Sequence, residues 1–249
     1  MRVSIITVAF NAVRTIDATL TSVAKQTHPD VEHIVVDGGS TDGTLQVLYR
    51  HQAHLAQLVS EPDQGIYDAM NKGLRMATGD VVGFLNADDV YADDGVLTRV
   101  AATMERENLE ALYGDAQFVS PDNPDKPVRR YRSDRFRPER ISWGWMPAHP
   151  ALFLRRSIYA RVGTFRTDYR IAGDFELVAR VFQTGSLRHR YLPEVLVTMR
   201  TGGVSTGGWR NTLLLNQEVL RACRQNGIRT NWLKILSKYP AKLLEFVRP

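Results

Sequence analysis

Two adjacent carboxylates, Asp88 and Asp89, follow an apolar run that ends at Leu85. Neighbouring negative charges repel one another, so such a pair at the end of a buried strand is tolerable when a cation neutralises it. Mg²⁺ and Mn²⁺ prefer oxygen ligands and keep positions open for water or phosphate. The pair therefore predicts a divalent metal site that holds a diphosphate, while a solvated turn like that at Asp93 and Asp94 is the alternative interpretation.

Other polar residues lie where a predicted strand ends or a predicted helix begins. Asp37 follows the apolar residues 33–36, where it could bind a nucleotide base or a ribose hydroxyl, or cap the turn into the next helix. Asp63 precedes a predicted helix whose free amides could meet an anion. Capping accounts for Asp63 but not for Asn71 and Lys72 in the middle of that helix, which makes both candidates for ligand contacts.

The first hundred residues alternate between short apolar runs and amphipathic segments, as in a parallel sheet covered by helices. Ligands bind such open sheets outside the carboxyl ends of the strands, so the polar residues at these ends should meet in one crevice. The expected strands are residues 3–8, 33–36, 58–60 and 81–85, and the expected helices are residues 16–24, 45–51 and 66–77.

Residues 100–249 are less regular, and we expect them to supply the second wall of the crevice. Amphipathic patterns predict one helix that begins just after Asp174 and another over residues 213–224. The cluster of proline, asparagine and aspartate at residues 121–127 indicates a loop. The expected strands of this half are residues 112–113, 116–119 and 128–131.

Four ordered and correctly spaced segments of the first hundred residues resemble family 2 glycosyltransferases, which have the GT-A fold. The third segment is most similar to the branch of polysaccharide-biosynthesis enzymes that includes the colanic-acid fucosyltransferases. The resemblance implies a GT-A-like α/β domain with a mostly parallel, Rossmann-like sheet flanked by helices. The segments are SIITVAFN at residues 4–11, VVDGGSTDGT at 35–44, EPDQGIYDAMNKG at 61–73 and FLNADD at 84–89.

The same resemblance implies how the chain is divided. Residues 1–100 would form the nucleotide-sugar-binding half, and residues 101–208 the acceptor-binding and catalytic-base half of the same domain. Residues 209–249 would form a C-terminal helical tail. The donor would thus bind on one side of the crevice and the acceptor on the other.

Roles for the strand ends follow from the resemblance. Phe10 would stack on the nucleotide base or line its pocket, and Asp37 would bind the base or the ribose. Asp88 would contact the ribose or the metal, and Asp89 would contact the metal and the diphosphate. Asn86 stands where the common DxD pattern begins with an acidic residue, so metal binding falls on the later pair.

Further donor contacts are implied within the third segment, from Asp63, Asn71 and Lys72. One departure from the family pattern bears on them. Met70 stands where an arginine often precedes the helix asparagine, so the contact that the arginine would make is expected from another residue, for example Lys72.

The catalytic base is expected in the acceptor half, since family members place an acidic residue there just before a helix. Asp174, in Gly173-Asp174-Phe175-Glu176, fits this pattern. Direct displacement at the anomeric carbon needs a carboxylate that deprotonates the attacking hydroxyl while a metal stabilises the departing diphosphate. Asp174 is the predicted base, a role compatible with capping the helix, and Glu176 is a weaker candidate. A single base, together with the family, implies inversion.

Three further residues are placed at the acceptor or over the donor. His149 is expected at the acceptor side, although a lone histidine is more often structural. The glycine-rich residues 202–208 resemble a flexible lid that orders over the donor diphosphate, where Arg200 and Ser205 would contact phosphate. Without the resemblance this loop is weak support, because no helix-starting phosphate motif accompanies it.

The net charge of +5, with basic residues concentrated after residue 128, predicts an anionic partner. From residue 231 onward an apolar stripe lies opposite Lys234, Lys238 and Lys242, which is typical of an interfacial helix on an anionic bilayer, and docking on the protein's own core is the alternative. No run reaches the roughly 18 apolar residues of a membrane span, and the single Cys223 excludes an internal disulfide. We expect a cytoplasmic protein, peripheral on the inner face of the membrane.

Together these features predict an inverting, metal-dependent glycosyltransferase that moves a hexosyl or deoxyhexosyl group from a nucleoside diphosphate donor to a glycan or lipid-linked glycan, in cell-surface polysaccharide or glycolipid biosynthesis. A non-catalytic nucleotide-sugar-binding module is one alternative. A sugar nucleotidyltransferase is another, but its usual N-terminal glycine-rich basic loop is represented here by Arg14 alone. A nucleic-acid binder is disfavoured, because aromatic and basic residues are not interleaved as in a recognised module.

Overall fold

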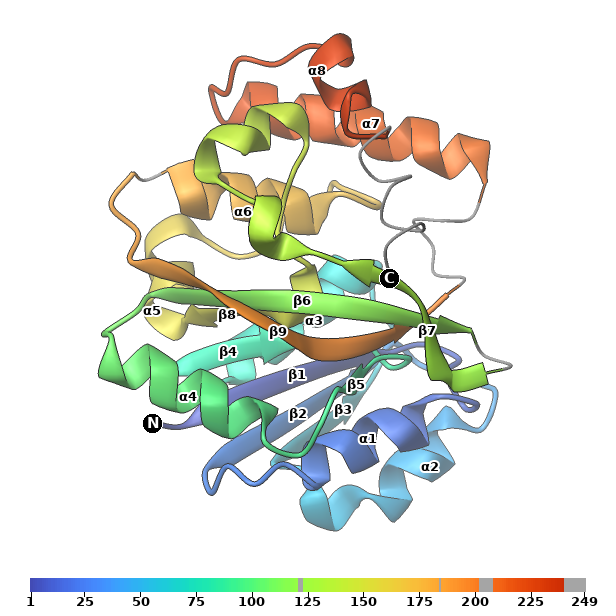
Figure 1. The fold of residues 1–249 in the computed structure, drawn as a ribbon. Helices are drawn as coiled ribbons and strands as arrows, with labels where there is room; N and C mark the ends of the chain where they lie inside the picture. Colours follow the sequence, from blue (N-terminus) through green and yellow to red (C-terminus); the bar gives the residue numbers. More distant parts are fainter. Residues whose placement is uncertain (121–122, 184, 202–207, 240–249) are drawn as a thin grey trace.

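The computed structural model describes residues 1–120, 123–183, 185–201 and 208–239 (Figure 1). A nine-stranded mixed sheet runs through these residues, in the order β3-β2-β1-β4-β8-β6-β9-β5, and β7 pairs with β6 beside that path. Helices cover the sheet, and α7 and α8 lie above α6 at the top of Figure 1. The α/β class predicted from the alternating pattern is therefore confirmed.

The donor half consists of four parallel strands and three covering helices. The strands occur because long β-branched runs suit positions that are buried on both faces, and all seven residues of β1 are buried. The predicted strands and helices of this half are all found, with ends that differ by a few residues. The elements are β1 (Val3–Ala9), α1 (Ile16–Ala24), β2 (Val31–Asp37), α2 (Thr44–Arg50), η1 (Gln52–His54), β3 (Gln57–Ser60), α3 (Ile66–Met76) and β4 (Val81–Phe84).

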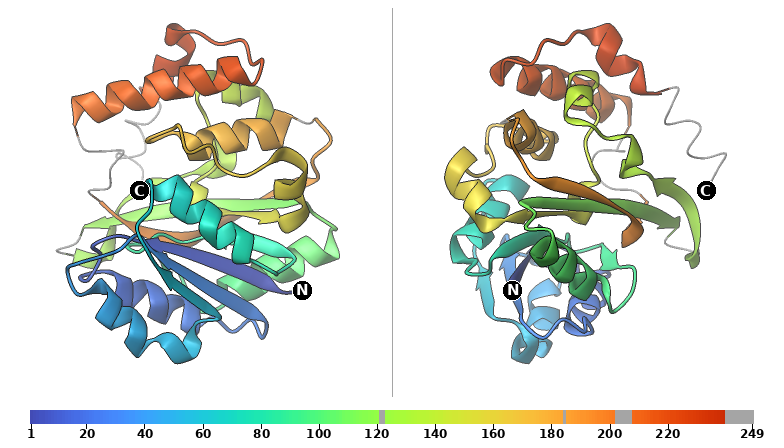
Figure 2. Two further views of the ribbon diagram at one scale, coloured as in Figure 1. Left: turned by 180° about the vertical axis from the view of Figure 1, so that it is seen from behind. Right: turned by 60° about the vertical axis from the view of Figure 1, so that its left-hand side comes forward.

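Neighbouring residues of these strands pack on opposite faces of the sheet. Val35 contributes to a cluster with α1 and α2, whereas Ile34 and Val36 contribute to a cluster with α3. This is the two-residue period of a strand, with both faces covered. Figure 2 shows α3 on one side of the parallel strands and α1 and α2 on the other. In open α/β sheets of this kind, ligands bind at the carboxyl ends of the strands.

The rest of the described chain, after β4, continues the same sheet rather than forming a second one. β8 lies between β4 and β6 and is antiparallel to both, so it joins the two halves. β6 and β9 are parallel, and β9 pairs with β5 at the far edge. The elements are β5 (Val90–Tyr91), α4 (Val96–Arg106), β6 (Ala111–Ser120), β7 (Asn123–Tyr131), η2 (Ser133–Arg135), η3 (Pro138–Trp143), η4 (His149–Ala151), β8 (Leu152–Arg155), α5 (Arg156–Val162), α6 (Gly173–Gln183), β9 (His189–Arg200), α7 (Trp209–Gln225) and α8 (Trp232–Leu236).

Two predictions for this half need correction. β6 is one strand of ten residues, where two short strands were expected. The expected loop at residues 121–127 is wrong from residue 123 onward, because β7 begins at Asn123 and pairs with β6 through Ser120–Asn123 and Val119–Pro127. β7 pairs with β6 alone, and proline is tolerated in such an edge strand because its missing N–H need not meet a second neighbour.

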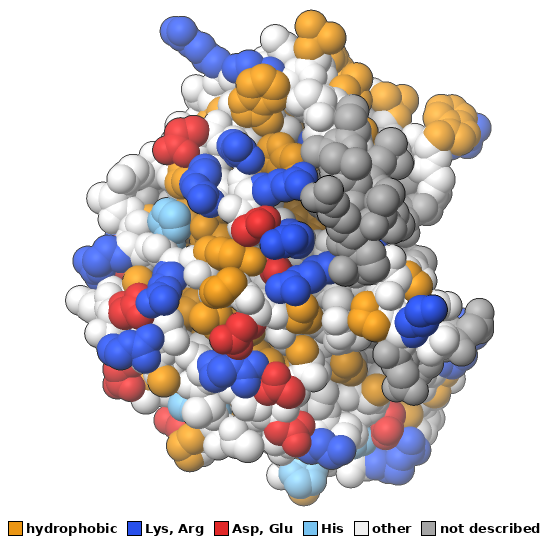
Figure 3. Space-filling model, in the orientation of Figure 1, with side chains coloured by type: hydrophobic (Ala, Val, Ile, Leu, Met, Phe, Trp, Pro, Cys, Tyr) orange, Lys and Arg blue, Asp and Glu red, His pale blue; other side chains and the backbone are white. Residues whose placement is uncertain are grey.

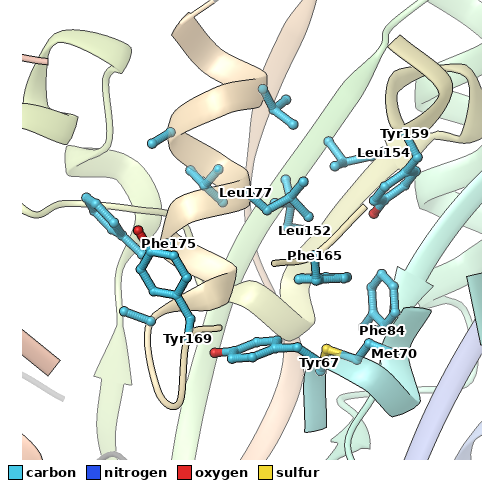
Figure 4. Close-up of a cluster of buried hydrophobic side chains, with 14 of the residues drawn as sticks. Tyr67, Met70, Phe84, Leu152, Leu154, Tyr159, Phe165, Tyr169, Phe175 and Leu177 are labelled. Carbon is cyan, nitrogen blue, oxygen red and sulfur yellow. The ribbon is translucent and has the colours of Figure 1, made fainter. Parts of the chain in front are cut away.

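An aromatic cluster joins the two halves directly beneath the strand ends (Figure 4). The ring of Phe84 in β4 meets the ring of Phe165 edge-on, with centroids 5.1 Å apart. Tyr67 in α3 stacks on Phe165 at 5.7 Å. Aromatic pairs of this geometry contribute about 0.5–1.5 kcal/mol beyond their buried area. The loop that carries Phe165 is thus packed against the donor half.

Candidate active site

The ends of the parallel strands meet at one edge of the sheet. Ala9 at the end of β1 pairs with Asp37 at the end of β2, and Asp37 pairs with Ser60 at the end of β3. Asn11, in the turn after β1, has a positive φ of 50° and accepts a hydrogen bond from the Thr41 amide at 2.9 Å. The turns after β1 and β2 are therefore fastened to each other, and the polar residues of these turns lie at one place.

Phe10 lies at this edge with an unusual exposure of 65% for a residue that follows a buried strand. Gly38 lies beside it, since a Cβ atom there would be 3.4 Å from the Phe10 ring and would collide with the Asp63 carboxylate. The exposed ring and the Asp63 carboxylate thus lie close to the Gly38 backbone, and a side chain at position 38 would displace the Asp63 carboxylate. A flat ring in such a position can stack on a nucleotide base.

Asp37 has no exposed surface, and its carboxylate is used within the protein. It accepts hydrogen bonds from the amides of Gly39 at 3.2 Å and Ser40 at 3.0 Å. The hydroxyls of Ser60, at 2.7 Å, and of Ser40 donate to it as well. This is the turn-capping role, which orders the loop from β2 to α2. A direct contact between Asp37 and a donor stays a prediction.

The two mid-helix residues of α3 have separate surroundings. The Lys72 ammonium pairs with Glu61 at 2.8 Å, a hydrogen bond that raises the pKa of Lys72, and it donates to the Pro62 carbonyl at 2.9 Å. Asn71 is buried and binds the backbone of Phe165 twice, donating to its oxygen at 2.8 Å and accepting from its nitrogen at 2.9 Å. Lys72 therefore stays beside the third strand end, whereas donor binding by Asn71 would require it to give up both hydrogen bonds.

The two carboxylates after β4 differ in accessibility. Asp89 is 1% exposed, and its carboxylate accepts a hydrogen bond from the side-chain Nδ2 of Asn86 at 3.2 Å. Asp88 is only partly buried. Burial raises the pKa of Asp89 well above its usual range, and the charge of Asp88 adds to the effect. Burial also raises the pKa of Asp88, and the nearby positive charge of Arg200 opposes that rise. A cation beside Asp88 would favour the ionised form of both groups.

The residues at this turn fit a metal that the donor helps to hold. Asp88 offers a hard, accessible oxygen ligand, and the buried Asn86 Oδ1 atom has no hydrogen-bond partner within the described residues. Across those residues no group of three histidine, cysteine or acidic side chains could hold a metal. Mg²⁺ is commonly bound by one or two carboxylates plus substrate phosphates, which matches a site with one accessible carboxylate.

Arg200 approaches the same turn from the other half of the molecule. It is the last residue of β9 and pairs with Val119 of β6. Its charge acts on Asp88, so a basic group lies near the predicted metal ligand. Ser205 and the predicted lid at residues 202–207 lie outside the described residues.

Asp174 and His149 come together on the acceptor side. Asp174 lies at the start of α6 and accepts a hydrogen bond from the Phe175 amide at 2.7 Å. His149 stacks on Phe84 with ring centroids 5.6 Å apart. Burial raises the pKa of Asp174, although the charge of His149 opposes that rise, and burial lowers the pKa of His149. A carboxylate with a raised pKa beside a neutral imidazole is suited to accept a proton.

Glu176, the weaker candidate for the base, has a structural role instead. It is 1% exposed and forms an ion pair with Arg180 at 2.8 Å, supplemented by a hydrogen bond from Asn226 at 3.2 Å. Arg180 also donates to the carbonyl oxygen of Thr164 at 2.7 Å. Because both carboxylate oxygens are bound and buried, this geometry does not support proton transfer by Glu176.

The tail docks on the protein as far as it is described. Ile235 in α8 is completely buried, and Asn216 of α7 donates to the Tyr239 hydroxyl at 2.6 Å. Leu233 on the same short helix is 81% exposed. The short helix α8 therefore packs on the protein through Ile235 and exposes Leu233. Lys242 lies outside the described residues. No helix among the described residues is long and apolar enough to span a membrane.

Two residues of this site were not singled out from the sequence. Tyr67 lies near Asp174: burial raises the pKa of Tyr67, and the charge of Asp174 adds to that rise. Through its hydroxyl, Tyr67 donates to the Ile171 carbonyl at 2.6 Å. Its place in the third recognised segment was a signal that could have been followed. Glu218 in α7 binds the backbone just before Asp174, and no local pattern marks it.

The sequence of this chain is similar to those of known proteins. Residues 4–163 match the family described as Glycosyl transferase family 2. A "PGL/p-HBAD biosynthesis glycosyltransferase" of Mycobacterium bovis (strain BCG / Pasteur 1173P2) is 32% identical, over 94% of this chain and 92% of that protein.

Two solved structures have a similar fold. S. aureus TarS in complex with UDP-GlcNAc superposes on 89% of this chain with a TM-score of 0.70 and 19% identity. The mannosyltransferase PcManGT from Pyrobaculum calidifontis, in complex with GDP-Man and Mn²⁺, superposes on 88% with a TM-score of 0.63 and 23% identity. The chain spans 66% of the TarS structure and 64% of PcManGT. The likeness confirms the GT-A-like fold class.

Proposed function

The chain belongs to glycosyltransferase family 2, and on this premise we propose that it moves a sugar from a nucleoside diphosphate donor to a hydroxyl of a glycan or lipid-linked glycan. The transfer depends on Mg²⁺ or Mn²⁺ and inverts the anomeric carbon. The sugar is a hexose or a deoxyhexose, and the product is a cell-surface polysaccharide or glycolipid.

The observation that carries this proposal is the partly buried Asp88 carboxylate near Arg200, at the edge where the parallel strands end. Asp88 would hold the metal, with the buried Asp89 beside it as the second predicted ligand. Arg200 contacts the diphosphate together with Ser205. Phe10 stacks on the base, with Asp63 and Lys72 nearby. Because the donor completes the coordination of the metal, metal and donor bind together.

On the acceptor side, the attacking hydroxyl gives its proton to Asp174 as its oxygen bonds to the anomeric carbon. The bond from that carbon to the diphosphate breaks, and its electron pair leaves with the diphosphate. A bound divalent ion supplies charge stabilisation for the leaving group. His149, held against Phe84, orients the acceptor beside Asp174. Attack opposite the leaving group by one hydroxyl, with one base, gives an inverted product.

Similar proteins support the choice of substrates. The mycobacterial relative is named a "PGL/p-HBAD biosynthesis glycosyltransferase", which favours a biosynthetic sugar transfer here. The structures with UDP-GlcNAc and with GDP-Man and Mn²⁺ favour a nucleotide sugar and a divalent metal. The likeness of residues 61–73 to the colanic-acid fucosyltransferase branch makes a deoxyhexose such as fucose a sugar to test early.

A ligand screen tests the proposal. UDP-, GDP- and dTDP-sugars are added with Mn²⁺, with Mg²⁺ or with EDTA, and the melting temperature is measured. A ligand that binds only the native state raises the melting temperature, so one donor class should stabilise the protein in the presence of metal. The stabilising donor is then incubated with glycolipid acceptors. Failure of every donor to stabilise the protein with metal would count against the proposal, and binding without any transfer would favour a non-catalytic module.

We also propose that the protein works in the cytoplasm and contacts the inner face of the membrane through α8 and the adjacent part of η3. Leu233, Leu236 and Trp143 are exposed there, and the Lys234 ammonium lies 5.5 Å from the centre of the Trp143 ring. Figure 3 shows apolar and basic side chains close together at this end of the molecule. Exposed apolar residues with a nearby lysine suit an anionic bilayer, whereas Lys238 of the same predicted stripe is buried.

Vesicle sedimentation tests this contact. The protein should pellet with vesicles that contain anionic lipid and remain in solution with zwitterionic vesicles. Leu233→Ser should weaken the binding, whereas Tyr49→Ser, which removes an exposed aromatic residue from α2 at the other end of the molecule, should not. Equal binding by the wild type and Leu233→Ser would refute this surface.

A further inference from the structure

The backbone that leads into Asp174 is bound by one carboxylate from a distant helix. Glu218 in α7 is 7% exposed and accepts three hydrogen bonds, each 2.8 Å long, from consecutive amides. The Arg170 amide donates to Oε1, and the Ile171 and Ala172 amides donate to Oε2. A carboxylate that accepts several backbone hydrogen bonds fixes the conformation of the chain it binds, since bonds to a charged acceptor are the strong ones.

The same face of α7 also contacts Asp168 and Tyr169, which come just before the segment that Glu218 binds. One turn along the helix from Glu218, Arg221 donates to the Asp168 carbonyl at 3.1 Å and lies 4.3 Å from the centre of the Tyr169 ring. The Tyr169 hydroxyl donates to Gln225 at 2.6 Å. Positions 218, 221 and 225 recur at helical spacing, so α7 presents one continuous surface to the whole segment.

Tyr67 limits the segment from the opposite side. Its hydroxyl donates to the Ile171 carbonyl, so the peptide unit between Ile171 and Ala172 is held by Glu218 through the Ala172 nitrogen and by Tyr67 through the Ile171 oxygen. Gly173, the first residue of α6, lies flat against the ring, and a Cβ atom there would be 2.7 Å from Tyr67 Cε2. Asp174 therefore follows a backbone that is fixed on two sides.

We propose that Glu218 is a positioning residue for the catalytic base, holding the backbone before Asp174 so that its carboxylate meets the acceptor hydroxyl. The inference rests on the proposed role of Asp174 and adds α7 to the parts of the molecule on which transfer depends. Glu218 acts through residues 170–172, whose amides it binds.

Glu218 also belongs to the charged surroundings of Asp174. The titratable groups that interact electrostatically with Asp174 are His149 from η4, Tyr67 from α3 and Glu218 from α7. The charge of Glu218 raises the pKa of Asp174, in the same direction as burial, while the charge of His149 opposes them. Removing the charge of Glu218 should therefore lower the pKa of Asp174 and let it act as a base at lower pH.

Glu218→Gln tests the proposal because it keeps the side-chain size but replaces one oxygen by an amide nitrogen, which cannot accept a hydrogen bond. We expect kcat to fall on the order of 100-fold, as for a catalytic group displaced by about 1 Å. Donor affinity should match that of the wild type. The acidic limb of the kcat/KM profile should move to lower pH, a change that loss of stability alone would not produce.

Two further variants separate charge from geometry. Glu218→Asp keeps the charge but shortens the side chain, so kcat should fall while the acidic limb stays in place. Gln217→Ala changes the exposed neighbouring residue of α7 and should behave as the wild type. If Glu218→Gln does not fold, Glu218→Asp decides the question, and a wild-type kcat there would overturn the proposal.

The outcome for Asp174→Asn keeps this inference distinct from the proposed function. If Glu218→Gln folds and keeps the wild-type kcat and acidic limb while Asp174→Asn is inactive, Glu218 has no positioning role and the proposed function stands. If Asp174→Asn is itself fully active, the proposed base is wrong and the positioning role is lost with it.

Discussion

The donor side and the acceptor side of the crevice are built differently. On the proposed donor side, the predicted ligand contacts lie shortly after strands: Phe10 follows β1 directly, and Asp88 stands in the turn after β4. On the proposed acceptor side, Asp174 follows a loop that is bound by Tyr67 and Glu218, which lie 104 and 46 positions from their partners in the sequence. We therefore expect donor contacts to depend on single side chains, and the position of the proposed base to depend on packing between distant segments.

The largest effect is expected at the proposed base, Asp174, where substitution should reduce transfer but not donor binding. Asp174→Asn cannot accept a proton, but its side-chain oxygen can still accept the hydrogen bond from the Phe175 amide. We expect kcat to fall on the order of 1,000-fold, within the range for loss of a general base, while donor affinity stays unchanged. Turnover and donor binding are measured on the same preparation. A variant that kept near-normal turnover would place the base elsewhere.

A second, smaller effect tests whether packing positions the base. In Gly173→Ala the added methyl group would lie 2.7 Å from the Tyr67 ring, so Tyr67 or α6 must move. Such overpacking costs about 2 kcal/mol of folding stability, and kcat should fall with donor affinity unchanged. Urea unfolding and steady-state kinetics measure the two effects.

The double variant Tyr67→Leu/Gly173→Ala provides the control, because removing the ring also removes the collision. The effect of Gly173→Ala on stability should be smaller in that background, as expected for residues in direct contact. An equal effect in both backgrounds, or no effect in either, would show that this contact does not position α6.

The smallest effect is expected on the donor side, at Phe10. Phe10→Ala removes a stacking surface, and donor affinity should fall about tenfold, at the lower end of what base stacking contributes. Because the ring is 65% exposed, folding stability should change little, and kcat at saturating donor should stay near that of the wild type. Phe10→Tyr keeps the ring and should bind the donor normally. A fall in kcat with unchanged donor affinity would contradict the proposed difference between the donor side and the acceptor side.

The parallel sheet could be predicted from the sequence because its strands are continuous β-branched runs and its turns carry polar residues. The position of β8 could not, since Val81 pairs with Arg155 and Ala111 pairs with Leu154 across long stretches of chain. Apolar patterns indicate which residues are buried, but they do not indicate which strand lies next to which. Residues 123–127 were misjudged because prolines favour turns, yet an edge strand tolerates them.

Some residues of the proposed site could also be predicted, because local sequence patterns mark them. Asp174 could be predicted as the base because the family resemblance implies an acidic residue just before a helix, and the local pattern at residues 171–177 fits it. Asn71 shows the limit, since a polar residue within a helix indicates that a partner exists, and the partner proved to be the Phe165 backbone. Glu218 had no signal at all, because a glutamate in a helix is common and only the folded chain brings it to residues 170–172.

The most direct test of the account is the metal dependence of donor binding at Asp88. Donor affinity is measured against Mn²⁺ concentration for the wild type, for Asp88→Asn and for Asp94→Asn, which changes an exposed aspartate of the second acidic pair. We expect Mn²⁺ to strengthen donor binding at least tenfold, about 1.4 kcal/mol, in the wild type and in Asp94→Asn. In Asp88→Asn donor affinity should no longer respond to Mn²⁺, and a wild-type response there would contradict the central claim.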